Sequence, residues 1–396
     1  MKINFVLANR SPNSISGVVT NFANYLSRQG HVIFISYPLI DHWDYYLWNL
    51  GKLYCVRKNK FWRLKYYLHF SWTVIIHLCS LRLFRKISGG LHSTLLPQIK
   101  HVRYFIVPNN SNMPDADFIV TFQEYLVPRL LKLSKRKGKV ISSIRSDLQG
   151  LIQNDSPLAN WFKRVIETAR DVNVVRFAVS RRSLESSLRL GIAVEEIIQN
   201  GIDVNKFYDS GRRGRISSVN VTCFIDTQNP HKGPEFGLEV IRKVRALYSG
   251  KNKAVFRCFG SNSNLGSANA VLAEVFDDVR GFLRTQDIIN YFRTTDIFIF
   301  PSFFEGFPST ILEAMACGCA VVTTAVSGVD ELNDEKNVCL VSPVSDIDAM
   351  VQNIITVINN VELRDRLRED SLIKAAVYSW ENATNKLISL LQKHSH

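Results

Sequence analysis

The chain has 396 residues, of which 46% are hydrophobic and 21% are charged, and its formal net charge is +14 at pH 7. This length exceeds what one hydrophobic core usually organises, so we expect two domains of roughly 150 to 200 residues. The ordinary balance of apolar and charged residues excludes a chain that is disordered throughout. The positive charge favours a polyanionic partner: nucleic acid, anionic lipid or a phosphorylated ligand.

The first half of the chain alternates strand and helix patterns. An apolar run at residues 3–8 is too short for a signal peptide and predicts a first strand. It is followed by a Ser, Asn, Pro and Gly-rich loop at 9–17, a helix that Gly30 stops, and a strand at 32–36. This βαβ unit predicts a parallel sheet with right-handed crossovers. Further strands are predicted at residues 118–121, 140–144 and 174–180, and a helix at 181–190.

Two loops of this half are candidate ligand sites. The loop that ends in Ser16 and Gly17 could bring backbone N–H groups against an anion, although a tight turn is the simpler explanation for one glycine. A polar cluster at residues 145–150 directly follows a predicted strand, where open α/β sheets place ligand-binding groups. Asp147 is therefore a candidate for contacting a sugar or an acceptor. The alternative is that Asp147 caps the next helix.

The second half repeats the α/β alternation after a polar segment, residues 209–218, that is typical of a linker. Strands are predicted at residues 221–225, 254–259, 297–300 and 320–324. Helices are predicted at residues 234–248, 268–276, 286–292, 310–317, 347–358 and 361–378, with a last amphipathic helix after Tyr378. The seven cysteines lie mostly in apolar runs and form no C-x-x-C pair, so we expect reduced, buried thiols in a cytoplasmic protein.

The most informative stretch is residues 296–318, DIFIFPSFFEGFPSTILEAMACG. Its apolar strand ends at Pro301 and its helix stops at Gly318, which places Glu305 on a loop and Glu313 in a first helical turn. Two such carboxylates, the second where a helix exposes unpaired N–H groups, suit a ligand with hydroxyls and phosphate. A nucleotide sugar is such a ligand.

Glu313 also has a simpler explanation. Thr310 and Glu313 have the spacing of a capping box, in which the glutamate bonds back to the threonine amide. Near the start of the second half, Lys232 precedes a predicted helix and could supply a point charge that neutralises a leaving diphosphate.

The whole stretch resembles the donor motif of family 4 glycosyltransferases, which typically reads E-G-F-x-x-x-x-L-E-A-M-A-C-G. The matching residues are Glu305, Gly306, Phe307, Glu313, Ala314, Met315, Ala316, Cys317 and Gly318. The resemblance implies the GT-B fold, an α/β architecture of two doubly wound Rossmann-like domains that face a cleft. It implies an acceptor domain at 1–205, a nucleotide-sugar domain at 206–378, and a helix at 379–396 that returns to the first domain.

The resemblance also implies roles for particular residues. Lys232 would stabilise the departing diphosphate with helix N–H groups near Ser309 and Thr310, Glu305 would orient the donor sugar, and Glu313 would bind ribose hydroxyls. Gly306 and Phe307 would belong to the donor loop, and Phe282 and Leu283 would contact the base through their backbone.

Two positions depart from the family pattern. Thr227 stands where family members usually have an Arg, which puts diphosphate binding or donor chemistry in doubt. Ser16 and Gly17 stand where the family often has two adjacent glycines near the donor phosphates and the acceptor.

The predicted reaction is transfer of a sugar from a nucleotide sugar to a hydroxyl of a glycan or lipid-linked acceptor, with retention of configuration, as in bacterial surface polysaccharide or glycolipid synthesis. No metal or other cofactor is expected. A non-catalytic nucleotide- or sugar-binding GT-B protein is the alternative. An NAD-dependent oxidoreductase lacks a G-x-G-x-x-G loop after a strand, and dispersed basic residues without a recognition motif argue against nucleic acid.

The sequence of residues 58–87 suggests a membrane surface as a further partner. Read at helical period, this stretch has a broad apolar face, with aromatic residues and with basic residues at its ends. It is too short and too interrupted for a membrane span but suits an interfacial helix on anionic lipid, which would place the protein on the inner face of the plasma membrane. A core helix of the N-terminal domain is the equal alternative.

Overall fold

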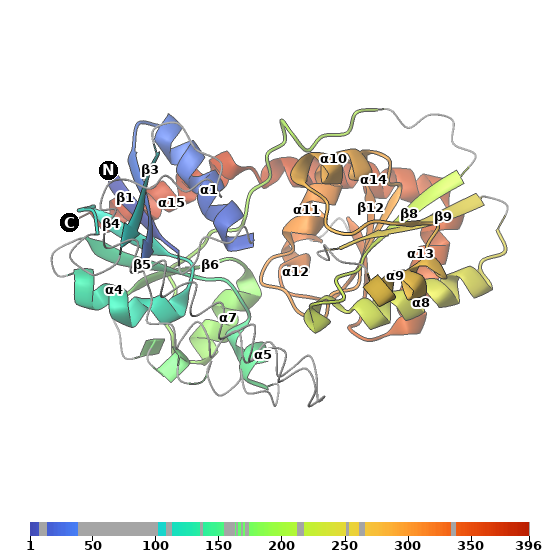
Figure 1. Cartoon of the computed structure of the whole chain (residues 1–396), viewed down its shortest axis with the longest axis horizontal. Helices are drawn as coiled ribbons and strands as arrows, with labels where there is room; N and C mark the ends of the chain where they lie inside the picture. The colour runs from blue at the N-terminus through green and yellow to red at the C-terminus, as the bar shows by residue number, and fades with distance from the viewer. Residues whose placement is uncertain are drawn as a thin grey trace.

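The computed structural model describes residues 1–7, 14–38, 102–107, 113–134, 138–153, 163, 165–167, 169–170, 174–211, 218–250, 253–260, 266–333 and 338–395. These residues form two α/β domains that lie side by side, each built on one parallel sheet (Figure 1). The predicted fold class is therefore confirmed. Residues 58–87, on which the membrane prediction depends, lie outside the described ranges.

The first sheet has seven parallel strands in the order β3-β2-β1-β4-β5-β6-β7. Its strands are β1 (Lys2–Val6), β2 (Val32–Pro38), β3 (Val102–Val107), β4 (Phe118–Thr121), β5 (Lys139–Ile144), β6 (Val175–Ala178) and β7 (Glu196–Ile197). Central strands such as β4 are buried on both faces, because helices cover the sheet from both sides.

The helices of this domain divide between the two faces of the sheet. They are α1 (Ser14–Arg28), the 3-10 helix η2 (Glu124–Leu126), α4 (Val127–Ser134), α5 (Leu148–Gln153) and α7 (Arg181–Arg189). Helix α1 packs into the core cluster that holds Ile3 and Phe5 of β1. Helix α4 packs with Val6 and Ile119, whose side chains point to the opposite face of the sheet.

The second sheet has six parallel strands in the order β10-β9-β8-β11-β12-β13. Its strands are β8 (Ser218–Phe224), β9 (Lys253–Phe259), β10 (Asp278–Val279), β11 (Ile297–Phe300), β12 (Ala320–Thr324) and β13 (Cys339–Ser342). Its helices are the 3-10 helix η3 (Pro230–Lys232), α8 (Pro234–Leu247), α9 (Gly266–Ala273), α10 (Thr285–Arg293), α11 (Ser309–Ala316), α12 (Val329–Leu332), α13 (Ile347–Asn359) and α14 (Val361–Val377).

The strand order reverses between β8 and β11, which pair directly although about 70 residues separate them in the chain. The chain leaves β8 toward α8 on one face of the sheet and reaches α11 on the other face after β11. A crevice opens at such a reversal beyond the carboxyl ends of the strands, and ligands bind there in open α/β sheets. The loops after β8 and β11 therefore border the place where a ligand is expected.

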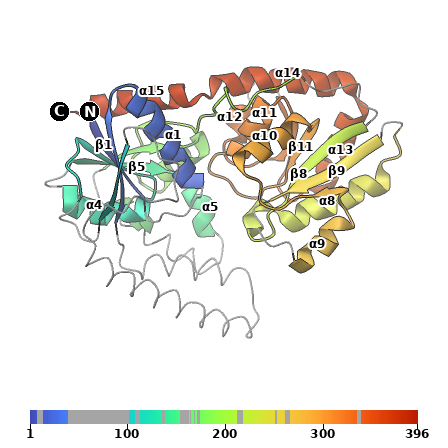
Figure 2. The same ribbon diagram turned by 45° about the horizontal axis from the view of Figure 1, so that its top comes forward.

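The last helix, α15 (Trp380–Lys393), leaves the second domain and packs on the first. Figure 2 shows α14 and α15 running along one side of both domains. Trp380 is buried beside Phe22 of α1, with 5.4 Å between the ring centroids. The crossing backbone is fixed by a hydrogen bond of 2.7 Å from the Ile202 amide to the Tyr378 carbonyl.

Several local expectations need correction. Helix α1 already begins at Ser14, so Ser16 and Gly17 lie in a helix rather than in a loop. Strands β3, β7, β10 and β13 are absent from the expected elements. The buried cysteines agree with the expectation for the five that the structure describes, Cys223, Cys258, Cys317, Cys319 and Cys339. Among the described helices, none is long and apolar enough to cross a membrane.

Candidate functional site

An ion pair joins the loops that follow β8 and β11. The Lys232 ammonium lies 2.5 Å from Oε1 of Glu305, and the glutamate is 9% exposed. Lys232 is the last residue of η3 and stays partly open to solvent, with its ammonium 5.6 Å from the centre of the Phe300 ring. A lysine and a glutamate that sequence separates by 73 positions thus meet at the strand-order reversal.

The carboxylate of Glu305 is held by its surroundings. The Ser302 hydroxyl lies 2.8 Å from the same Oε1 atom, and the Thr324 hydroxyl donates to the Ser302 carbonyl. Gly233 follows Lys232 with a φ of +59°, and a Cβ there would lie 2.1 Å from the Pro301 carbonyl oxygen. Only glycine fits both the left-handed backbone and this close approach, which brings the two loops together.

Glu313 lies one turn inside α11 rather than in its first turn. The helix begins at Ser309 with Pro308 as its N-cap residue and no side-chain capping bond, which rules out the capping-box alternative. Among the described residues, its carboxyl group makes no hydrogen bond or ion pair, and burial raises the pKa of Glu313 to about 7. This leaves an acceptor group for a ligand.

The first turn of α11 contains an amide, that of Thr310, that is free in the described part of the structure. The Ser309 amide donates to the Phe307 carbonyl at 3.0 Å and the Ile311 amide donates to Pro308, whereas the Thr310 amide has no acceptor among the described residues. Phe307 is buried in the core beside Tyr378, so its side chain anchors the loop between β11 and α11 to the core of the second domain. Of the two amides expected to contact phosphate, that of Ser309 already has an acceptor, and that of Thr310 has none within the described ranges.

The remaining donor candidates lie around the same sheet edge. Phe282 is 64% exposed between β10 and α10, and Leu283 packs against the core. Thr227 is exposed after β8, and the preceding Asp226 is buried and accepts the Gln228 amide at 3.1 Å, which shapes this turn. The turn is thus shaped by the Asp226 carboxylate, and Thr227 stands where the resembled family usually has an arginine.

On the N-terminal side, Asp147 precedes α5 and its Oδ1 accepts the Gly150 amide at 3.1 Å. This is the capping role that the sequence left open as an alternative. Gly17 is exposed on α1, and its carbonyl accepts the Asn21 side chain. Neither residue is brought into contact with the Lys232–Glu305 pair by an interaction that the structure shows.

A hydrogen-bond chain across the domain boundary was not expected from the sequence. Arg145 donates from Nη2 to Oδ1 of Asn200 at 2.5 Å, and Nδ2 of Asn200 donates to the Ser309 hydroxyl at 2.8 Å. Close by, a Cβ on Gly306 would lie 1.8 Å from the Arg145 carbonyl oxygen. The available signals were Arg145 directly after a strand and Asn200 in an Asn-Gly turn, and neither indicates a cross-domain contact.

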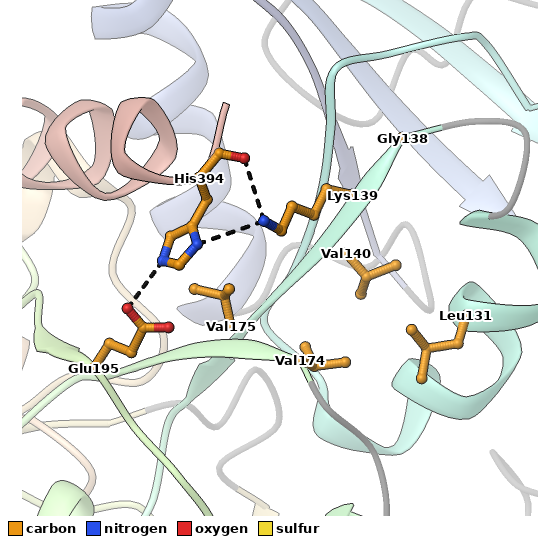
Figure 3. A pocket seen from close by; sticks show the side chains of 8 residues that line it. All are labelled: Leu131, Gly138, Lys139, Val140, Val174, Val175, Glu195 and His394. Carbon is orange, nitrogen blue, oxygen red and sulfur yellow. Dashed lines mark hydrogen bonds and ion pairs between the residues drawn. The ribbon is translucent and has the colours of Figure 1, made fainter. Parts of the chain in front are cut away.

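A separate hollow of about 410 Å³ lies at the amino ends of the strands of the first sheet, away from the carboxyl ends where ligands bind. Lys139, Val175 and Glu195 line it, and each stands at or next to the start of a strand (Figure 3). His394 Nε2 lies 2.9 Å from Oε2 of Glu195, and Lys139 contacts the same histidine. This polar cluster fastens the end of α15. Ligands of parallel sheets bind at the carboxyl ends of the strands, so we place no catalysis in this hollow.

Across the described ranges, no three His, Cys, Asp or Glu side chains are grouped to hold a metal ion.

Sequence comparisons point to the second domain. Residues 220–360 match the family model described as glycosyl transferases group 1. The chain is 32% identical over 109 residues to O-antigen chain mannosyltransferase B of Escherichia coli, covering 28% of each chain. It is 31% identical over 215 residues to D-inositol 3-phosphate glycosyltransferase of Saccharomonospora viridis, covering 50% of this chain and 49% of the relative. The aligned regions thus span half or less of these relatives.

Structure comparisons cover the whole chain. Sucrose-phosphate synthase of Thermosynechococcus elongatus superimposes with a TM-score of 0.70 at 14% identity, over 99% of this chain and 98% of that one. Anabaena HepE in complex with UDP and glucose superimposes with a TM-score of 0.67 at 15% identity, over 99% and 100%. The chain thus has the GT-B fold, and through its second domain it is related to the group 1 glycosyl transferases.

Proposed function

We propose that the protein is a glycosyltransferase that moves a sugar from a nucleotide sugar to a hydroxyl of a glycan or lipid-linked acceptor, with retention of configuration. The observation that carries the proposal is the Lys232–Glu305 pair, 2.5 Å apart at the strand-order reversal of the domain that matches the group 1 model. The printed names of the relatives, which include a mannosyltransferase, support sugar transfer, and the UDP and glucose bound to HepE support a nucleotide-sugar donor.

In this proposal Lys232 bridges Glu305 and the donor diphosphate. An ammonium group has three N–H donors, and Glu305 takes one of them. The other two have no acceptor among the described residues and are available to phosphate oxygens, where they would stabilise the charge that builds up on the leaving diphosphate. The Thr310 amide at the positive end of α11 would add a further donor to the same anion.

Glu305 and Glu313 would hold the sugar and ribose. Glu305 is kept in place by Lys232 and Ser302, so its Oε2 atom faces no competing partner among the described residues and would accept a sugar hydroxyl. Glu313 would accept hydrogen bonds from ribose hydroxyls. Neither carboxylate is proposed as a covalent nucleophile, and the mechanism uses no metal or other cofactor.

The biological setting is part of the proposal. Transfer to a glycan or lipid-linked acceptor fits bacterial surface polysaccharide or glycolipid synthesis, and the chain would act in the cytoplasm or on the inner face of the plasma membrane. The name O-antigen chain mannosyltransferase B of one relative supports this setting. The membrane surface would be met through residues 58–87.

A panel of nucleotide sugars tests the proposal. Purified protein is incubated with each nucleotide sugar and with candidate acceptors, and release of nucleoside diphosphate is measured. We expect release with one donor and one acceptor class, and loss of release in the Glu305→Gln variant. A protein that releases nothing from any donor, yet binds nucleoside diphosphates in calorimetry, would instead be the non-catalytic GT-B binding protein. Thr227 in place of an arginine gives that second function its support.

A further inference from the structure

The guanidinium of Arg145 has no counter-ion in the described part of the chain. It follows directly on β5, and its guanidinium lies 5.5 Å from the centre of the Phe122 ring. Nη2 donates to Asn200, whereas Nη1 is buried without a hydrogen-bond partner. No carboxylate in the described ranges pairs with it, and burial lowers the pKa of Arg145 to about 9. Cation–π contact offsets only part of such a desolvation cost.

The hydrogen bonds from Arg145 to Asn200 and from Asn200 to Ser309 form a relay. The chemistry of the three side chains fixes which atom donates in each of these bonds. A guanidinium only donates, so the Asn200 atom that faces it is the carbonyl oxygen. The other amide atom of Asn200 is then the NH₂ group, which donates to the Ser309 oxygen at 2.8 Å. The reversed amide would set the NH₂ group of Asn200 against the N–H group of Arg145, so only this orientation lets both groups form a hydrogen bond.

The relay leaves the Ser309 hydroxyl with one role. Its oxygen accepts from Asn200, and among the described residues its hydrogen is donated to no acceptor. The next amide, that of Thr310, is also free in the described part of the chain. Two adjacent donors therefore stand at the first turn of α11, with the positive charge of Arg145 two hydrogen bonds away. A ligand that only accepts hydrogen bonds, and that carries negative charge, fits this arrangement.

We propose that Arg145 and Asn200 are positioning residues that turn the Ser309 hydroxyl toward a phosphoryl oxygen of the nucleoside diphosphate. This inference rests on the proposed function and extends it, because it assigns a role in donor binding to two residues of the N-terminal domain. The relay crosses the domain boundary, so the diphosphate site is complete only when both domains are in the present arrangement.

The Asn200→Asp variant tests the relay with almost no change in shape. An aspartate accepts from Arg145 and also accepts from Ser309, so the serine hydroxyl turns away from the ligand while the buried cation gains a counter-ion. We expect binding of UDP, ADP or GDP, measured by calorimetry, to weaken roughly tenfold to a hundredfold, the scale of a lost hydrogen bond to a charged group. The melting temperature should stay level or rise.

Two further variants complete the test. Asn385→Asp adds the same charge at an exposed position on α15 and should leave binding unchanged. Ser309→Ala should weaken binding about tenfold by removing the donor, and adding Asn200→Asp to it should cost less than in the wild type. If Asn200→Asp does not fold, the Ser309→Ala result decides: wild-type binding would overturn the relay.

The outcomes separate this inference from the proposed function. A wild-type protein that binds a nucleoside diphosphate and transfers sugar, together with an Asn200→Asp variant that is folded and binds equally well, would overturn the relay alone. A merely structural role predicts that result, since the aspartate only improves the charge balance of the fold. A wild-type protein that binds none of the three nucleotides would overturn both.

Discussion

At the scale of single residues, the ion pair of Lys232 and Glu305 predicts a different effect on stability for each of its two members. We expect Glu305→Gln and Lys232→Ala each to lower turnover by at least ~10²-fold, the scale of losing one charge-stabilising group. Glu305→Gln should keep its melting temperature, because an amide preserves the bond to Ser302. Lys232→Ala should melt earlier, because it leaves a buried carboxylate without its cation.

The control is Lys243→Ala, which removes an exposed lysine that pairs with Asp348 far from the site. Its turnover should equal that of the wild type. Steady-state rates and thermal melts of the three variants decide the matter, and full activity in a folded Glu305→Gln protein would remove the glutamate from the mechanism.

Glu313 carries a pH signature. Burial raises its pKa to about 7, so the folded state holds its proton more tightly than the unfolded state does. Stability that is present below about pH 4.5 is therefore lost as the pH rises toward 7. Glu313→Gln should remove this loss and raise the unfolding free energy at pH 8 by at most about 3 kcal/mol, and by less where water reaches the half-buried carboxyl.

Urea unfolding of both proteins at pH 5 and pH 8 measures this effect. The gain should be larger at pH 8, and a gain that is the same at both pH values would contradict a raised pKa.

The same residue predicts a kinetic effect that is separate from stability. Glu313→Ala should raise the Michaelis constant for the donor with little change in the catalytic constant, because ribose contacts hold the ground state and the transition state alike. Donor titrations at pH 8, where the carboxyl group is mostly ionised, measure this effect. An unchanged Michaelis constant beside a changed melting temperature would leave Glu313 a purely structural residue.

At the scale of elements, α15 is the last helix of the chain, yet it completes the first domain. Trp380, Leu387 and Leu391 fill the same core cluster as β1 and α1. Trp380→Ala should lower the unfolding free energy by about 3 to 5 kcal/mol, since a large buried side chain leaves a cavity. Leu188→Ala, on the exposed surface of α7, should change it by no more than about 0.5 kcal/mol.

Hydrogen exchange locates this loss. Amides of β1 should exchange faster in Trp380→Ala, while those of β8 in the second domain stay protected. Equal loss of protection in both sheets would mean that α15 supports the whole molecule rather than one domain.

The stretch at residues 58–87 makes a separate prediction from its sequence alone. If it forms an interfacial helix, the protein should pellet with anionic liposomes at low salt and less so at high salt. Changing Arg82, Arg85 and Lys86 to Glu should weaken pelleting, because these basic residues would meet the lipid phosphates. Equal recovery in the supernatant with and without liposomes would assign the helix to the protein core.

A charge-matched control excludes a general effect of net charge. The exposed residues Arg242, Lys253 and Arg366 of the second domain are changed to Glu in one protein. This protein has the same net charge as the first triple variant, and its pelleting should stay close to that of the wild type.

At the scale of the whole molecule, the two domains meet at a point without room for a side chain. A Cβ on Gly306 would lie 1.8 Å from the carbonyl oxygen of Arg145, across the domain boundary. Gly306→Ala should therefore push the domains apart and break the relay from Asn200 to Ser309. We expect an increased radius of gyration in solution scattering and reduced turnover, with the melting of each domain retained. Wild-type values of both quantities would show that the boundary adapts without opening.

Local patterns in the sequence determined much of the fold and singled out the centre of the proposed donor site. Apolar runs closed by Pro301 and Gly318 located β11 and α11, because strand and helix periods and their stop signals act over a few residues. The same stretch singled out Glu305 and Glu313 through a resemblance that the second domain supports. Short strands such as β10 and β13 carried too few residues for a period to emerge.

Only the tertiary structure decided which distant residues meet. Parallel sheets return the chain to the same edge after each crossover, which brings Arg145 and Asn200 of the first domain together. The packing of the second domain against the first then brings Ser309 to Asn200, although no local pattern connects these residues. The structure also decided where α1 begins, since the helix includes Ser16 although its Ser, Asn, Pro and Gly-rich surroundings predicted a loop. For Asp147 it selected between two alternatives that the sequence offered, because the side chain accepts the Gly150 amide and caps α5. The sequence determines which chemical groups are present, and the packing of the two domains determines which of these groups lie close enough to contact the same ligand.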